Sequence, residues 1–167
     1  MSSLLATLTA IVRLFLWLAA AALAVLPLIT FYDVVMRYVF YAPTIWATEI
    51  SIYLLMFIVF TTAGALVIEG GHLRVTFWIE RLQGRRRAIA EIATTLLVLP
   101  YAIILAWYGW IYTERAIRQE MVSPSLLEVP LWIVYGVIPL GGILLIFAVF
   151  IKASLLFCQL KKRGIEE

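Results

Sequence analysis

The sequence VPLWIVYGVIPLGGILLIFAVFI, residues 129–151, contains no Asp, Glu, Lys, Arg or His over 23 positions. Three further stretches lack these residues, at 14–32, 50–68 and 92–113, and they are 19, 19 and 22 residues long. A helix needs about 20 mostly apolar residues to cross a hydrocarbon core of about 30 Å. The charge-free stretches therefore predict an all-α integral membrane protein with four transmembrane helices. They leave no ionisable group deep in the membrane, where an ion-driven pump is expected to keep one.

The composition agrees with this fold class. Of the 167 residues, 65% are hydrophobic, and the mean hydropathy is +1.04, whereas a soluble domain is about 45–50% apolar. We therefore predict a single four-helix membrane domain over residues 1–167, with spans at about 12–33, 46–69, 89–113 and 129–153. Ala22-Leu23-Ala24 fits a signal-peptide cleavage site, but the apolar run continues past it, which favours an uncleaved first span.

The basic residues are distributed unevenly between the two sides of the predicted membrane domain. Ten of the 13 Lys and Arg residues lie before the first charge-free stretch, between the second and third, or after the fourth, and three lie in the other two gaps. Short basic loops stay in the cytoplasm. This bias predicts that both termini and the second gap are cytoplasmic. It also accounts for the net charge of +3, so no nucleic-acid partner is expected.

The second gap has a helical pattern of its own. Val75, Trp78, Ile79 and Leu82 fall at i, i+3, i+4 and i+7, which is typical of one apolar helix face. We predict a short amphipathic helix on the cytoplasmic membrane surface at about 73–83, ended by Gly84. The adjacent Arg85, Arg86 and Arg87 are candidates for binding lipid headgroups, each attracted by about 1 kcal/mol near an anionic surface. The alternative is a charged connector without regular structure.

The first gap contains charged residues that can pair. Asp33 and Arg37 are four residues apart, with the acid first, which is the favoured order on a helix. Glu49 opens the second span one turn after Trp46, and Arg37 and Glu49 lie at the outer ends of adjacent helices, where they could also meet. These four residues are candidates for a polar lock that fixes the helix pair or holds a partner subunit. The alternative is solvated charge at headgroup level.

The third gap carries mixed charge. Glu114, Arg115, Arg118 and Glu120 indicate that the third helix extends beyond the membrane, with Glu114 and Arg118 spaced to pair. Ser123-Pro124-Ser125 is expected to break that helix. This outward element could dock a periplasmic protein or be an ordinary solvated helix end.

The inner end of the second span contains His72 and Arg74, which are candidates for structural or subunit contacts. His72 is the only histidine, and a lone histidine cannot supply the paired axial ligands of a bis-histidine haem. We expect it to cap the turn, with a proton relay as the alternative. The chain has no nucleophile elbow, phosphate loop or two-carboxylate constellation, so no catalytic, substrate-binding, metal or cofactor residue is assigned.

Several residues inside the spans carry structural expectations. Pro27 and Pro100 each remove a backbone hydrogen bond and can kink their helices. Gly136, Gly141 and Gly142 can let another helix approach closely. Hydroxyl groups within the spans can bond the backbone of their own helix; they belong to Ser51, Thr61, Thr62, Thr94 and Thr95.

Two ordered sets of short motifs point to a family. The first is Arg37-Tyr38-Val39-Phe40, Pro43, Trp46-Ala47-Thr48-Glu49 and Glu69-Gly70-Gly71-His72-Leu73-Arg74-Val75; the second is Pro130-Leu131-Trp132, Tyr135 and Pro139-Leu140-Gly141. In this order, on four spans, the chain resembles the small membrane subunit (DctQ-like) of tripartite ATP-independent periplasmic (TRAP) transporters. It departs from the family pattern at Thr76, where an acid is frequent, and at Leu82-Gln83, where Leu-Pro is frequent.

The resemblance implies a three-part uptake system in a bacterial or archaeal inner membrane. A periplasmic binding protein captures an organic acid, a large permease subunit carries the substrate and sodium sites, and the small subunit packs beside it as an accessory scaffold, in contact with membrane lipids. This chain would then be neither an enzyme nor a substrate-binding protein. One alternative is an autonomous small four-helix transporter, for which Glu49 is the only nearby carboxylate. Another is a membrane enzyme or redox anchor, against which the single histidine argues.

Overall fold

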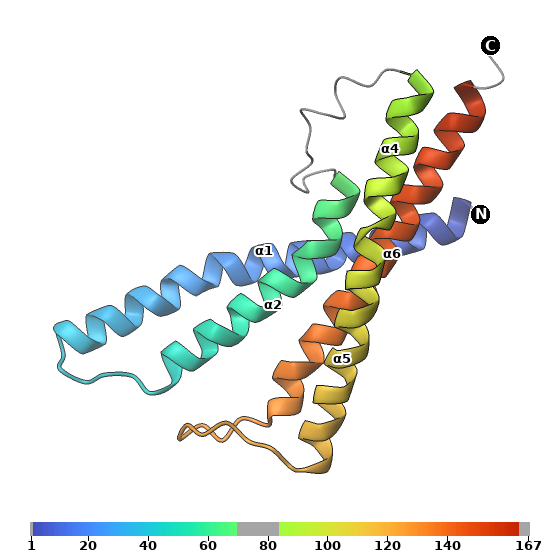
Figure 1. The fold of residues 1–167 in the computed structure, drawn as a ribbon. Coiled ribbons are helices and arrows are strands. Elements are labelled where there is room, and N and C mark those ends of the chain that lie inside the picture. The colour runs from blue at the N-terminus through green and yellow to red at the C-terminus, as the bar shows by residue number, and fades with distance from the viewer. Residues whose placement is uncertain (1, 70–83, 164–167) are drawn as a thin grey trace.

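The computed structural model describes residues 2–69 and 84–163, with side chains over 5–68 and 89–157. The helices of these residues are α1 (Ser2–Tyr38), α2 (Trp46–Glu69), α4 (Gly84–Leu96), α5 (Val98–Arg118) and α6 (Leu131–Arg163) (Figure 1). The predicted all-α class is confirmed. The predicted surface helix at 73–83, with His72 and Arg74, lies outside the described residues.

Four segments are long and apolar enough to cross a membrane, as the charge-free stretches predicted. They are Leu5–Tyr38, Trp46–Ile68, Ile89–Arg118 and Leu131–Phe157. The first of these segments is longer than the stretch 12–33 at both ends, and the third is longer than 89–113 at its C-terminal end. The helix α6 continues beyond residue 153 to Arg163. Arg13 and Lys152 lie inside these helices rather than at their ends.

The third span consists of α4 and α5, which are nearly continuous. The break falls at Leu97, whose N–H still donates to the Ala93 carbonyl oxygen at 3.0 Å. Pro100 follows three residues later, and its ring crowds the carbonyl four positions earlier, so the interruption lies where this proline predicts it. In contrast, α1 continues through Pro27.

Gly84 was expected to end the surface helix, but it is the first residue of α4. Arg85, Arg86 and Arg87 therefore follow it inside a helix that leads directly into the third span, and they do not form part of a loop. Their assignment to lipid headgroups stays a prediction.

The helices form two antiparallel hairpins that diverge. Figure 1 shows α1 beside α2, and α5 beside α6, with the connections 39–45 and 119–130 at separate corners of the molecule. α6 is central, because it packs against α1, α2, α4 and α5. The hairpins meet where Val12 of α1, Ala65 of α2 and Leu144 of α6 form one buried cluster.

Glycines allow α6 to approach both of its main neighbours. A Cβ atom on Gly141 would lie 2.6 Å from the Phe60 carbonyl oxygen of α2, and one on Gly142 would lie 2.7 Å from the Ala106 nitrogen of α5. The expected close approach is therefore confirmed at these two positions. It is not found at Gly136, where the nearest atom would be Thr113 Cγ2 at 3.9 Å. Such van der Waals packing, rather than the hydrophobic effect, holds helices together in lipid.

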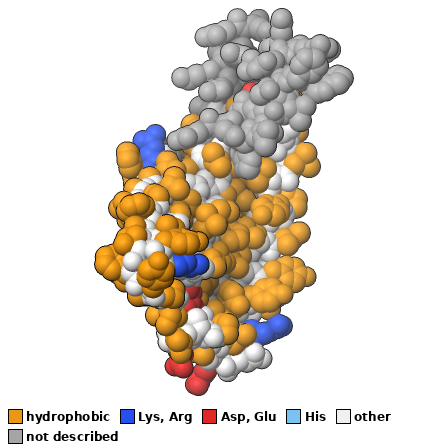
Figure 2. Space-filling model, turned by 90° about the vertical axis from the view of Figure 1, so that its left-hand side faces the viewer, with side chains coloured by type: hydrophobic (Ala, Val, Ile, Leu, Met, Phe, Trp, Pro, Cys, Tyr) orange, Lys and Arg blue, Asp and Glu red, His pale blue; other side chains and the backbone are white. Residues whose placement is uncertain are grey.

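Hydroxyl groups in the spans bond their own helices, as expected for the four threonines. The Thr61 hydroxyl donates to the Phe57 carbonyl oxygen at 2.6 Å, and Thr62, Thr94 and Thr95 bond carbonyl oxygens three or four residues earlier. Ser51 instead lines a groove that is described below. The outer surface is mostly apolar, as Figure 2 shows for one face, and includes Trp17 and Trp107.

Candidate functional site

The first polar cluster closes the α1–α2 hairpin beside the 39–45 connection. Arg37 donates from a terminal guanidinium nitrogen to Asp33 Oδ2 at 2.8 Å, and the Thr44 hydroxyl donates to Asp33 Oδ1. The Arg37 side chain is 49% exposed, whereas that of Asp33 is only 12% exposed. The predicted pair within the helix is confirmed, and Thr44 extends it by fastening the 39–45 connection to α1.

Trp46 supports the same end of the hairpin. It begins α2, and its ring stacks on that of Tyr32 in α1, with centroids 5.8 Å apart and planes at 28°. Aromatic pairs of this kind contribute about 0.5–1.5 kcal/mol beyond their buried area. Trp46 therefore has an observed role within the hairpin, and its assignment to a subunit interface stays a prediction.

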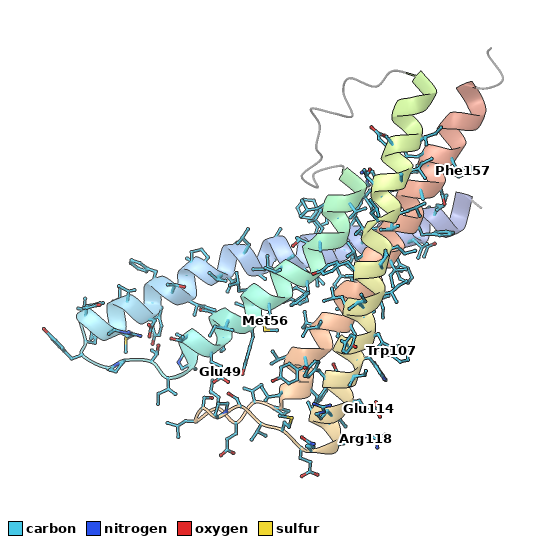
Figure 3. All side chains as sticks on the ribbon, viewed as in Figure 1. Glu49, Met56, Trp107, Glu114, Arg118 and Phe157 are labelled. Atoms are coloured by element: carbon cyan, nitrogen blue, oxygen red, sulfur yellow. The ribbon has the colours of Figure 1, made fainter. Side chains whose placement is uncertain are left out.

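Glu49 belongs to a second polar cluster. Its carboxylate accepts hydrogen bonds from the hydroxyls of Tyr53, one turn later in α2, and of Ser125, in the 119–130 connection. Figure 3 shows Glu49 at the start of α2, close to that connection. This contact joins residues 76 positions apart and bridges the diverging hairpins.

The predicted contact between Arg37 and Glu49 is wrong, because both residues are described and no ion pair joins them. Arg37 bonds Asp33 one turn earlier on its own helix, while Glu49 faces the 119–130 connection. Asp33 and Arg37 pair because they share one helix face. Glu49 instead contacts Ser125, in a segment that was predicted only to break a helix. Tyr53 and Ser125 are therefore site residues that the sequence did not predict.

The α5 end carries the residues predicted to dock a periplasmic protein. Arg118 donates to Glu114 Oε1 at 2.6 Å, and the Arg115 guanidinium lies 5.7 Å from the centre of the Tyr112 ring. The helix continues past the charge-free stretch to Arg118, and the predicted Glu114–Arg118 pair is confirmed. The pair is largely exposed, so it contributes little to stability, and its docking role remains a prediction.

Glu120 ends the helix through its backbone. Its φ is 47°, its N–H donates to the Ile117 carbonyl oxygen at 3.2 Å, and the Met121 N–H donates to the Ala116 carbonyl oxygen at 3.0 Å. This is a Schellman motif, in which glycine usually holds the position with positive φ. The helix therefore ends before Ser123-Pro124-Ser125, the segment expected to break it.

The remainder of the 119–130 connection is a short hairpin. The Ser123 N–H donates to the Val129 carbonyl oxygen at 2.9 Å, and the Leu131 N–H donates to that of Met121 at 2.9 Å. Ser123 is buried, while Leu126 at the tip is 81% exposed. These backbone bonds hold Ser125 where it meets Glu49.

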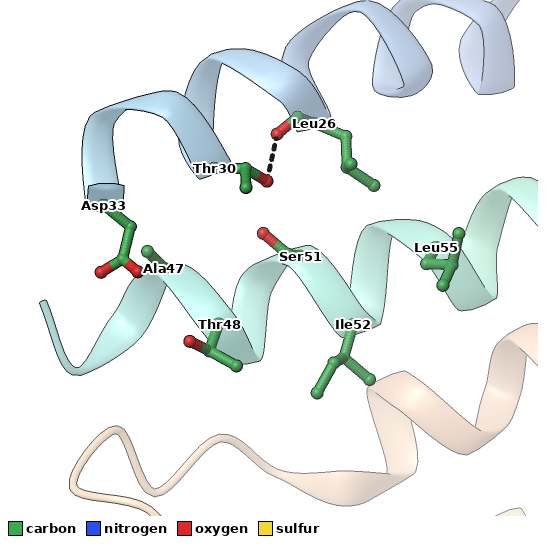
Figure 4. Close-up of a pocket in the computed structure, with 8 residues that line it drawn as sticks. All are labelled: Leu26, Thr30, Asp33, Ala47, Thr48, Ser51, Ile52 and Leu55. Atoms are coloured by element: carbon green, nitrogen blue, oxygen red, sulfur yellow. Dashed lines mark hydrogen bonds between the residues drawn. The ribbon is translucent and has the colours of Figure 1, made fainter. Parts of the chain in front are cut away.

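A groove of about 260 Å³ lies between the halves of α1 and α2 that are nearer the 39–45 connection (Figure 4). It is more polar toward that connection and apolar farther from it; the lining consists of Leu26, Thr30, Asp33, Ala47, Thr48, Ser51, Ile52 and Leu55. In Figure 4 the Ser51 hydroxyl points toward α1, and the Thr30 hydroxyl donates to the Leu26 carbonyl oxygen at 3.0 Å. The lining contains one acid and no base, an arrangement that suits contact with an apolar chain rather than acid–base chemistry.

At the opposite end of the spans, Lys152 of α6 reaches across to α2. Its ammonium group donates to the Val67 carbonyl oxygen at 2.6 Å, where a cation stabilises the last turn of a helix. The segments of the chain that the structure describes contain no group of three or more His, Cys, Asp or Glu residues able to hold a metal ion. The polar groups that are placed at both ends of the spans are therefore suited to joining helices and loops.

Comparison with known proteins identifies what the chain is similar to. Residues 26–159 match the family described as tripartite ATP-independent periplasmic transporters, DctQ component. A curated relative, the C4-dicarboxylate TRAP transporter small permease protein DctQ of Vibrio cholerae serotype O1, is 26% identical over 152 residues. The match covers 78% of this chain and 66% of the relative, so the chain spans just under two thirds of that protein's length.

Proposed function

The chain belongs to the DctQ family of TRAP transporter components, and we propose on this basis that it pairs with a large permease subunit as an accessory scaffold. As a small TRAP permease component with four apolar helices, it is a multi-pass inner-membrane protein. The proposed system takes up an organic acid with sodium and depends on a periplasmic binding protein. The observation that carries the proposal is the family match, which covers the last part of the first span and the whole of the other three.

The distribution of polar groups supports an accessory role. The central parts of the described spans contain no Asp, Glu, Lys, Arg or His side chain, and threonine hydroxyls within the spans bond their own helices. A coupling site for an ion would be expected to place a charged group there. We therefore assign substrate and sodium binding to the large subunit, and we assign no enzymatic activity to this chain. The printed name of the relative specifies C4-dicarboxylates, so a C4-dicarboxylate is the first substrate to test.

Co-purification tests the proposed pairing. When the affinity-tagged chain is expressed with the large permease subunit, we expect both to elute as one complex of constant stoichiometry. The apolar outer faces of α1 and α5 supply the surface that such a complex can bury. An untagged chain is the control for non-specific retention. Recovery of the tagged chain alone, although both proteins are present in the membrane, would count against the pairing.

We also propose that both termini are cytoplasmic, as the basic residues predict. In a chain in which Cys158 is replaced by alanine, we expect a cysteine at the exposed Leu126 to react in intact cells with a maleimide that cannot cross the membrane. A cysteine introduced at position 87 should react only after the membrane is opened. The reverse pattern would reject this orientation.

A further inference from the structure

We propose that Glu49 pairs with a Lys or Arg side chain of the large membrane subunit; this inference rests on the proposed function. Within the described residues Glu49 accepts from neutral hydroxyl groups, among them those of Tyr53 and Ser125, and no cation lies within ion-pair distance. Neutral hydroxyl groups can solvate this carboxylate, but they leave its negative charge uncompensated. An assembled complex can supply the missing cation.

The other acids at the outer end differ from Glu49. Asp33 is paired with Arg37, and Glu114 is paired with Arg118. Glu120 and Glu128 are exposed, so water solvates them. Glu49 alone in this group is partly buried and bonded only by neutral donors. Glu49 is therefore the carboxylate in this group that is best placed to form an ion pair with another chain.

An open groove lies beside this carboxylate. Its volume is about 370 Å³, and its lining consists of Ile45, Thr48, Glu49, Ile52, Tyr53, Ser123 and Ser125. The apolar residues can contact the methylene stem of a basic side chain, while the carboxylate and hydroxyl oxygens can accept from its charged head. The groove therefore matches the two chemical parts of Lys or Arg.

The level of the groove favours a membrane partner over the periplasmic binding protein. Glu49 lies in the first turn of the span Trp46–Ile68. The flanking Ile45 and Ile52 are 58% and 52% exposed, and such apolar surface suits a neighbouring helix end at the membrane surface better than a water-soluble protein. We therefore assign the cation to the outer end of a helix of the large subunit.

The Glu49→Gln variant tests this assignment. The amide oxygen of glutamine can still accept from Ser125, but the charge is lost. We expect the isolated chain to keep its thermal stability, while its affinity for the large subunit falls by about tenfold or more. The matched control is Glu128→Gln, which makes the same change at an exposed residue of the 119–130 connection and should leave affinity unchanged.

Recovery of the wild-type complex tests the proposed pairing of the two subunits, whereas the Glu49→Gln variant tests the ion pair alone. If the wild-type complex forms and Glu49→Gln binds the large subunit equally well, the inference is rejected. Equal losses of isolated-chain stability and affinity would also reject it, because they indicate a contact only within the chain. If Glu49→Gln weakens docking of the binding protein while the large subunit still binds normally, the cation belongs to the binding protein, and its assignment to the large subunit is rejected.

Charge reversal identifies the partner residue. The Glu49→Lys variant should lose the complex, and changing the correct Lys or Arg of the large subunit to Asp should restore it. We expect rescue from one position at an outer helix end. Failure of every outward Lys and Arg of the large subunit to give rescue would contradict the pairing.

Discussion

Replacing Gly141 or Gly142 by alanine is expected to destabilise the chain by about 1–3 kcal/mol for each substitution. The added Cβ atoms would lie 2.6 Å from the Phe60 carbonyl oxygen and 2.7 Å from the Ala106 nitrogen. Both are backbone atoms, so a rotamer change cannot relieve the contact, and α6 would have to move away from α2 or α5. Because α6 joins both hairpins, these glycines determine whether the four spans pack as one unit.

Gly136→Ala is the matched control, since it makes the same change in the same helix. Its Cβ would have 3.9 Å to the nearest atom, and alanine favours a helix by about 0.8–1.0 kcal/mol over glycine. Thermal unfolding in detergent, with size-exclusion chromatography, should show loss of stability for Gly141→Ala and Gly142→Ala only. Similar behaviour of all three variants would contradict the packing described for α6.

The spans could be predicted from the sequence because lipid excludes charge, and the charge-free stretches locate the apolar segments directly. The helix ends beyond them could not be predicted in this way. Lys152, for example, was expected near the end of the fourth span, but α6 continues past it and its ammonium group bonds the Val67 carbonyl oxygen of α2. Where a basic side chain finds such an acceptor depends on how two helices pack.

The candidate site was predictable to the extent that its contacts are local. Asp33 and Arg37 pair because four residues make about one helical turn. The bond between Glu49 and Ser125 spans 76 positions, and it exists only because the two hairpins place the 119–130 connection beside α2. The spacing of apolar and charged residues along the sequence does not predict such a contact. The role of Glu120 in ending the helix could not be predicted either, because the position with positive φ at a helix end is usually occupied by glycine.

The second large effect concerns transport itself. In the described spans Asp, Glu, Lys, Arg and His are absent from the central region, and the acids lie near the span ends. We therefore expect the chain alone in liposomes to show only background uptake of a C4-dicarboxylate under a sodium gradient. The same chain, reconstituted with the large subunit and supplied with the binding protein, should support uptake.

Uptake by proteoliposomes of defined composition tests the accessory role most directly. The measurement compares vesicles containing this chain alone, the large subunit alone, and both subunits, each with binding protein outside and an inward sodium gradient. The account predicts uptake above background only when both subunits are present, and its loss when the sodium gradient is collapsed. Sodium-driven uptake by vesicles that contain this chain alone would contradict it.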